Sequence, residues 1–195
     1  MALSTSDLQG NLEASFTKQR DSDASNQLAA AQDLATNIVE YAKGTSILVA
    51  GAPPLIPAPP AVPIPDASVI GQRATINPAI AQAGQAVLFG QINQSFTLKD
   101  PTMAMISAGI MTYIATFTIF SIGGITCTGA TVPTTPPVFA PLTAKGLDGG
   151  TIKECTGLLA DIIHLTFSTA VFNGMVVNPT TGAVLPGVLT PSILM

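Results

Sequence analysis

Charge is the property that this chain lacks most. Only 9% of its 195 residues are Asp, Glu, Lys or Arg, against about 25% in an ordinary soluble domain. Hydrophobic residues make up 47%, which is near average, so charge is missing rather than apolar content being in excess. From Pro101 to Ala144 there is no charged residue and no histidine. Such a composition favours a protein whose surface is covered by neighbours, because a lone monomer would expose a large uncharged area.

Other scarcities exclude further classes of protein. The net charge is -4 and the pI is about 4.6, so no Lys/Arg stripe is present to neutralise phosphates, and nucleic acid is not expected as a partner. The two cysteines, Cys127 and Cys155, are too few for a disulfide scaffold and lack metal-ligand spacing. We expect both to be buried thiols. The N-terminal residues have no basic segment followed by an apolar one, so no secretory signal is predicted.

Candidate chemistry is confined to one region near the C-terminal end. His164 is the only histidine, and Asp161 lies at a spacing that puts both on one face of a helix. A hydrolase would also need a nucleophile, but Cys155 lies too far along the same predicted helix to contact His164. Asp148 and Glu154 lack the spacing of a calcium loop, and the run KGLDGG resembles a phosphate loop only in its glycines. The sequence therefore predicts no enzyme, no metal, no cofactor and no small-molecule substrate.

Capping residues and apolar spacing predict two helices near the N-terminus. Ser4 and Asp7 have capping-box spacing, and the apolar stripe that follows them is that of a short amphipathic helix. A second helix ends at Gly44. The stripe of the first helix consists of Leu8, Leu12 and Phe16, and that of the second consists of Leu28, Ala31, Leu34, Ala35, Ile38 and Tyr41.

A proline-rich segment follows a short β-rich run. Seven prolines lie between Pro53 and Pro65, which excludes a helix or a central strand and predicts an extended arm. Its apolar spacers predict an arm that lies along another surface rather than a flexible linker. A ligand for a proline-recognition domain is the alternative, although no Arg or Lys anchor flanks the prolines.

The segment from Met103 to Ile125 has two interpretations. It is uncharged and long enough to span a bilayer, so the alternative function is a small pore-forming or anchored membrane protein. However, the Asp100-Pro101 start is typical of a soluble helix, no Lys/Arg cluster flanks the segment, and Ala115 to Ile122 alternates like a strand. We expect a buried helix, then a strand with Phe117 and Ile119 on its inner face, and a membrane location is disfavoured.

Two further helices complete the prediction. Asn77 before Pro78 starts one helix, whose apolar spacing continues to Ile92 although Gly84 and Gly90 weaken it. Thr151 and Glu154 form a capping box that starts the longest, which is expected to end near Asn173 with Gly174 as its C-cap. The C-terminal tail is predicted to form one or two strands and an extended end.

A shift of 72 positions aligns two parts of the chain. It places Leu34 on Ile106, Ile38 on Ile110, Tyr41 on Tyr113, Ile47 on Ile119 and Gly51 on Gly123. The hypothesis is an internal duplication of a helix-strand-arm-helix unit with a pseudo-twofold. The predicted organisation is an N-terminal helix and arm (1–25), a first unit (26–98), a second unit (99–177) and an extended tail (178–195).

Three segments resemble the small structural proteins of large contractile-tailed bacteriophages. They are Ile38 to Ala50 (IVEYAKGTSILVA), Gly124 to Gly129 (GITCTG) and Lys145 to Leu159 (KGLDGGTIKECTGLL). The resemblance implies a virion component of the tail, baseplate or neck, assembled in the host cytoplasm and present in several copies. Its partners would be further copies of itself and other virion proteins.

The sequence thus predicts an α+β protein of helices, short strands and extended proline-rich arms. The expected function is that of a non-enzymatic structural subunit that packs through apolar arms onto neighbouring chains. The residues expected at these interfaces are Leu8, Leu12, Phe16, Leu55, Ile56, Val62, Ile64, Val138, Phe139, Val188 and Leu189.

Overall fold

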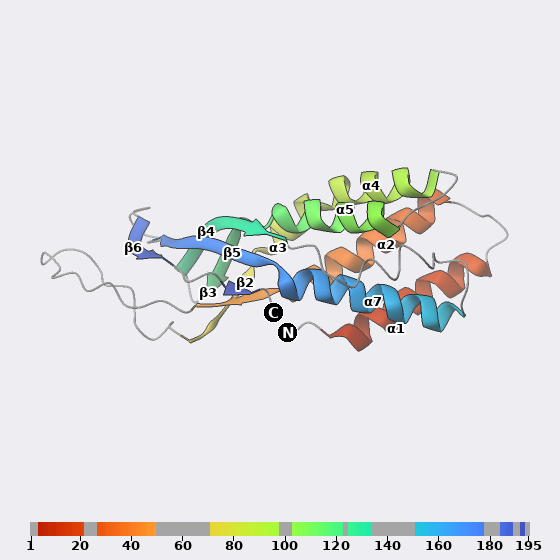
Figure 1. Ribbon diagram of the computed structural model, residues 1–195, viewed down its shortest axis with the longest axis horizontal. Coiled ribbons are helices and arrows are strands. Elements are labelled where there is room, and N and C mark those ends of the chain that lie inside the picture. Colours follow the sequence, from red (N-terminus) through yellow and green to blue (C-terminus); the bar gives the residue numbers. More distant parts are fainter. Residues whose placement is uncertain are drawn as a thin grey trace, which may run out of the picture.

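Helices and strands occupy opposite ends of an elongated molecule (Figure 1). The computed structural model describes residues 4–21, 27–49, 71–97, 103–122, 125–133, 151–177, 184–188 and 192–193. Within these ranges the chain combines a helical bundle with one antiparallel sheet. The predicted α+β class is therefore confirmed.

Five of the described helices pack in a closed series. Helix α1 contacts α2, α2 contacts α4, α4 contacts α5, α5 contacts α7, and α7 returns to α1. A short helix, α3, precedes α4 and packs against both α2 and α4. The bounds are α1 (Thr5–Arg20), α2 (Gln27–Ala42), α3 (Pro78–Ala83), α4 (Gln85–Thr97), α5 (Met103–Ala115) and α7 (Ile152–Thr169).

The sheet follows the order β1-β2-β3-β4-β5-β6, with every pair antiparallel. Strand β7 pairs with β5 on the side away from β4 and also lies close to β1. The sheet therefore curves so that β7, next to β5, approaches the edge strand β1. The strands are β1 (Ser46–Leu48), β2 (Arg73–Ile76), β3 (Ile119–Ile122), β4 (Ile125–Val132), β5 (Val171–Val177), β6 (Val184–Val188) and β7 (Ser192–Ile193).

Three helices lead into strands of this one sheet: α2 into β1, α5 into β3, and α7 into β5. Because β2 and β4 separate these strands in an antiparallel order, β1, β3 and β5 all run in the same direction, away from the helices. The C-terminal ends of β1, β3 and β5 consequently lie at the end of the sheet remote from the bundle (Figure 1).

Three of the predicted helix starts are confirmed, and they depend on local hydrogen bonds; the start predicted at Asp100-Pro101 lies outside the described residues. The Ser4 side chain accepts from the Asp7 backbone N–H, and the Asn77 side chain accepts from that of Ala79. Thr151 and Glu154 form the complete capping box. Each side chain satisfies a backbone donor that has no partner within the helix.

The end predicted for the longest helix is wrong. Helix α7 ends at Thr169, and β5 begins at Val171, so Gly174 is not a helix cap. Gly174 instead lies opposite Gly129 of β4, and a Cβ on Gly174 would lie 2.8 Å from the Thr128 carbonyl oxygen. Gly174 therefore allows β4 and β5 to approach closely, and spacing along the sequence cannot reveal such a tertiary contact.

Other predictions also need correction in detail. The strand expected from Ala115 begins only at Ile119, and Phe120 rather than Ile119 is its fully buried residue. Phe117 is buried, but in the connection between helix and strand. In α2 the predicted apolar face is buried except for Leu28, which is 54% exposed.

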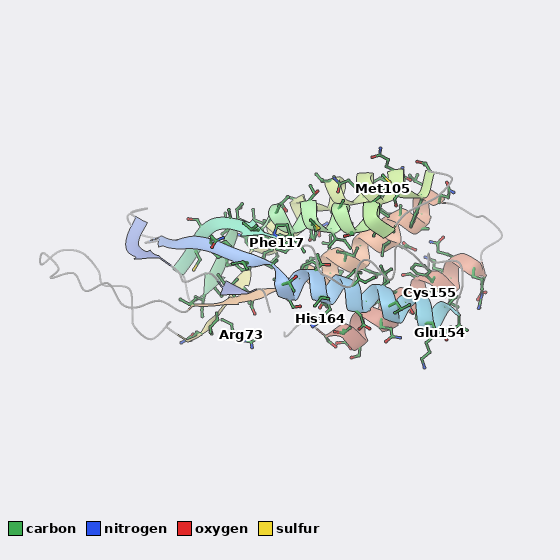
Figure 2. All side chains as sticks on the ribbon, in the orientation of Figure 1. Arg73, Met105, Phe117, Glu154, Cys155 and His164 are labelled. Carbon is green, nitrogen blue, oxygen red and sulfur yellow. The ribbon has the colours of Figure 1, made fainter. Side chains whose placement is uncertain are left out.

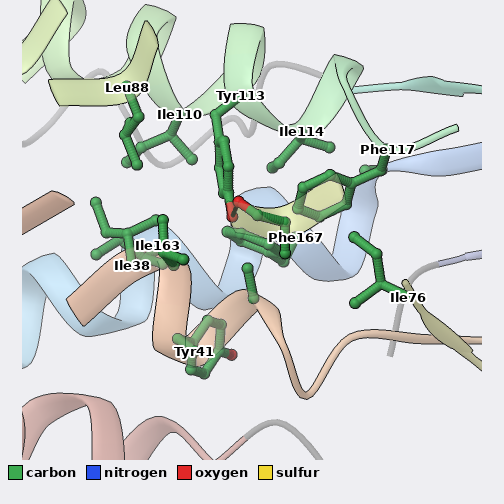
Figure 3. Close-up of a cluster of buried hydrophobic side chains, with 14 of the residues drawn as sticks. Ile38, Tyr41, Ile76, Leu88, Ile110, Tyr113, Ile114, Phe117, Ile163 and Phe167 are labelled. Carbon is green, nitrogen blue, oxygen red and sulfur yellow. Dashed lines mark hydrogen bonds between the residues drawn. The ribbon is translucent and has the colours of Figure 1, made fainter. Parts of the chain in front are cut away.

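One hydrophobic core joins the bundle to the sheet (Figure 3). It contains residues from both 26–98 and 99–177, so these ranges do not form separate cores. Strands β1 and β3 flank β2 and run in the same direction, while the duplication and its pseudo-twofold stay predictions. Both aligned sets of helix residues are buried: Leu34, Ile38 and Tyr41 of α2, and Ile106, Ile110 and Tyr113 of α5.

Candidate functional site

The described charges lie on one part of the molecule. Helices α1, α2 and α7, with the residues next to their ends, carry all of them except Arg73 of β2. Figure 2 shows Glu154 on α7 and Met105 on α5, on opposite sides of the bundle. The charged residues concerned are Asp7, Glu13, Lys18, Arg20, Asp21, Asp33, Glu40, Lys43, Lys153, Glu154 and Asp161.

The outer side of α4 and α5 carries no charge. Its exposed side chains are small or neutral, and the largest apolar one is Val87, which is 46% exposed. The two helices pack against each other, so these residues form one surface, which we call the neutral face. It consists of Ala86, Val87, Gly90, Gln94 and Thr97 of α4 and Ala108, Thr112 and Ala115 of α5.

Close contacts fix α5 against α3 and α4. The Tyr113 hydroxyl donates to the Ala81 carbonyl oxygen at 2.9 Å. The ring of Tyr113 lies against Gly84, where a Cβ would approach two ring carbons to 2.7 Å. Gly84 also separates α3 from α4, in place of the continuous helix expected there. At Gly109 a Cβ would lie 3.1 Å from the Gln91 Oε1, so the helices approach closely and support the neutral face.

An aromatic cluster joins the bundle to the sheet beneath this face. Phe167 of α7 makes an edge-to-face contact with Tyr41 at 5.5 Å and lies 5.9 Å from Phe117. Phe117 in turn contacts Tyr113 at 5.0 Å. Burial raises the pKa values of both tyrosines, which disfavours ionisation of their hydroxyls. The ends of α2, α5 and α7 are thereby held together (Figure 3).

His164 takes part in this packing. Its Nδ1 lies 2.6 Å from the Tyr41 hydroxyl, whereas Asp161 is exposed on α7. Cys155 lies on the same helix about 13 Å further along the axis, given a rise of 1.5 Å per residue. Among the described residues there is no cluster of three or more metal-ligating side chains.

The predicted interface residues divide into four groups. Leu8 and Leu12 are 2% and 0% exposed, because α1 packs on α2 and α7 of its own chain; the prediction that they contact a neighbouring chain is wrong. Phe16 is partly buried against the same core. Val188 is the last residue of β6, opposite Met175. The remainder lie outside the described residues: Leu55, Ile56, Val62, Ile64, Val138, Phe139 and Leu189.

The uncharged segment from Met103 to Ile125 is not one helix. It comprises α5, the connection through Phe117, β3 and the first residue of β4. Throughout the part of the chain that the structure describes, no helix has both the length and the apolar character needed to cross a membrane.

The neutral face extends beyond the region that the sequence singled out. The chain is also uncharged from Ala74 to Leu98, which includes all of α4. That absence was the available signal, and packing of α4 on α5 joins the two uncharged stretches. No protein-family model, curated protein or solved structure matches the chain.

Proposed function

We propose that this protein is a non-enzymatic structural subunit of a phage or phage-like tail, baseplate or neck assembly. In this assembly the neutral face is covered by neighbouring chains. The observation that carries the proposal is the division of charge, with charged side chains on α1, α2 and α7 and none on α4 or α5. The charged side would face water, and the uncharged side would face protein.

The chemistry of the neutral face suits burial. Covering a charged group without a partner costs several kcal/mol, and this face has no such group to desolvate. Small residues such as Ala108 and Gly90 leave the backbone close to the surface, so another chain can approach closely. Apolar area removed from water contributes about 25 cal/mol per Å², and the exposed Val87 would add to it.

The virion setting is supported by the resemblance of three segments to phage structural proteins and by the apolar, proline-rich segments. Assemblies of this kind repeat one subunit many times, so a modest interface per subunit suffices. The partners would be further copies of this chain and other virion proteins.

A matched pair of variants tests the assembly role. Ala108 lies in the middle of α5 on the neutral face, and Ala14 lies in the middle of α1 on the charged side; both are exposed. Ala108→Glu should lower the mass measured by analytical ultracentrifugation, because it forces a charge into the buried interface. Ala14→Glu should leave the mass unchanged. A monomeric wild type at every concentration, or equal behaviour of both variants, would contradict the proposal.

A second experiment tests the virion setting. Quantitative mass spectrometry of purified contractile-tail particles from the source of the chain should find it in several copies per particle. If the protein is absent from such particles, the proposed phage setting is wrong, although the proposed role as an assembly subunit is not affected.

A further inference from the structure

The segment between β1 and β2 begins and ends at a hydrogen-bonded base. Beyond the two strands, the Val49 N–H donates to the Gln72 carbonyl oxygen at 2.9 Å, and the Gly71 N–H donates to that of Val49 at 2.8 Å. Gly71 has a φ of +83°, a conformation that glycine adopts at little cost. Residues 50–70 therefore leave and re-enter the fold at one fixed point.

The base lies at the end of the sheet that is remote from the helices of its own chain. Strand β1 continues from α2 and runs toward the remote end of the sheet (Figure 1). At about 3.1 Å per residue, a polyproline-type segment of this length that leaves and returns to one point can extend about 30 Å from that point. Helix α4 has 13 residues and spans about 20 Å, so such a segment is long enough to lie along an entire helix of another copy.

The chemistry of the segment matches the neutral face. Asp66 is the only charged residue between positions 50 and 70, and the remainder is dominated by proline, alanine and branched aliphatic residues. A chain of this kind cannot pair the charges that it would cover on α1, α2 or α7, so burial there would be costly. On α4 and α5 it meets no charge. Proline also lowers the conformational entropy lost when the segment binds.

We infer that residues 50–70 of one copy bind the neutral face on α4 and α5 of a second copy. This inference rests on the proposed assembly function and makes it specific. The end of β1, where the segment begins, and the neutral face on α4 and α5 lie toward opposite ends of the molecule (Figure 1). The contact is therefore head-to-tail, and repeating it generates a ring or a filament rather than a closed dimer.

Photo-crosslinking in the full chain tests this contact. The photoreactive residue p-benzoylphenylalanine would replace Ala108, or Gln94 in case the first variant fails to fold, with Ala14 as the control position. Unlabelled variant is mixed with ¹⁵N-labelled wild-type chain, irradiated and digested with trypsin. Cleavage at Lys43 and Arg73 releases the whole segment as residues 44–73, and cleavage at Lys99 and Lys145 releases residues 100–145.

The expected product joins unlabelled residues 100–145, or residues 74–99 for the variant at position 94, to labelled residues 44–73, with a yield several-fold above any product from position 14. Replacing residues 54–67 by a short Gly-Ser linker should remove this product. Two results would overturn this inference and leave an assembly role intact. One is a cross-link to residues 44–73 that forms only within one chain, and the other is a cross-link to a different peptide of a second copy. A chain that stays monomeric and gives no intermolecular product would overturn both proposals.

Discussion

Gly84 and Gly90 provide a sharp test of how α5 is held against α3 and α4. At Gly84 an added Cβ would lie 2.7 Å from two carbons of the Tyr113 ring, whereas at Gly90 nothing lies within 4 Å. Tyr113 cannot easily move aside, because it is fully buried and its hydroxyl donates to the Ala81 carbonyl oxygen. The two substitutions to alanine should therefore have opposite signs.

The magnitudes follow from three contributions. Replacing glycine by alanine within a helix stabilises by about 0.5–1 kcal/mol, and Gly90→Ala should show this gain. Gly84→Ala adds overpacking, which costs about 1–3 kcal/mol, and displaces a buried hydrogen bond, which costs about 1–3 kcal/mol when a partner is left unsatisfied. We expect Gly84→Ala to lower the free energy of unfolding by at least about 1 kcal/mol overall.

Urea denaturation followed by circular dichroism measures both changes. It should be repeated at several protein concentrations, because association stabilises the folded state by mass action. A stability gain for Gly84→Ala equal to that of Gly90→Ala would refute the packing of Tyr113 described above.

Three further predictions concern the caps, the core and the thiols. Thr151→Ala should lower the free energy of unfolding by about 1 kcal/mol through loss of the N-cap. Hydrogen bonds from Thr151 lower the pKa of Glu154 below its usual 4.5, so this carboxylate stabilises the fold above pH 4.5 and stops doing so as the pH falls through the lowered pKa. Glu154→Gln should therefore reduce the loss of stability at acid pH in a curve of unfolding free energy against pH. Phe167→Ala should cost about 3–5 kcal/mol in urea denaturation; a loss below about 1 kcal/mol would contradict its place between Tyr41 and Phe117. Burial raises the pKa of Cys127, so its thiol should react with a disulfide reagent only after unfolding, and rapid reaction in the native protein would contradict its burial.

Local signals in the sequence were sufficient for the starts of helices. Ser4, Asn77 and Thr151 each act on backbone groups within three residues, so their side-chain chemistry and spacing determine the outcome. The pairing of β3 with β4 was predictable for the same reason, because two short runs of β-forming residues are separated by only a Gly-Gly pair in the sequence.

Features that depend on distant contacts could not be predicted. The stripe containing Leu8 and Leu12 shows that something covers α1, but not that α7 of the same chain does so. A glycine after a helical pattern suggests a cap, and only the pairing of β4 with β5 shows that Gly174 faces Gly129 instead. Likewise, the neutral face required the packing of α4 on α5 to join two uncharged stretches of sequence.

The central claim is that neighbouring chains cover the neutral face. The rate of maleimide labelling tests this claim most directly. It is measured over a range of protein concentrations for two variants, Ala108→Cys and Ala14→Cys, both made in a Cys155→Ser background in which the remaining cysteine, Cys127, is buried. We expect Cys at position 108 to become many-fold slower to label as the protein concentration rises, while Cys at position 14 labels at a constant rate. Equal and concentration-independent rates at both positions would contradict it.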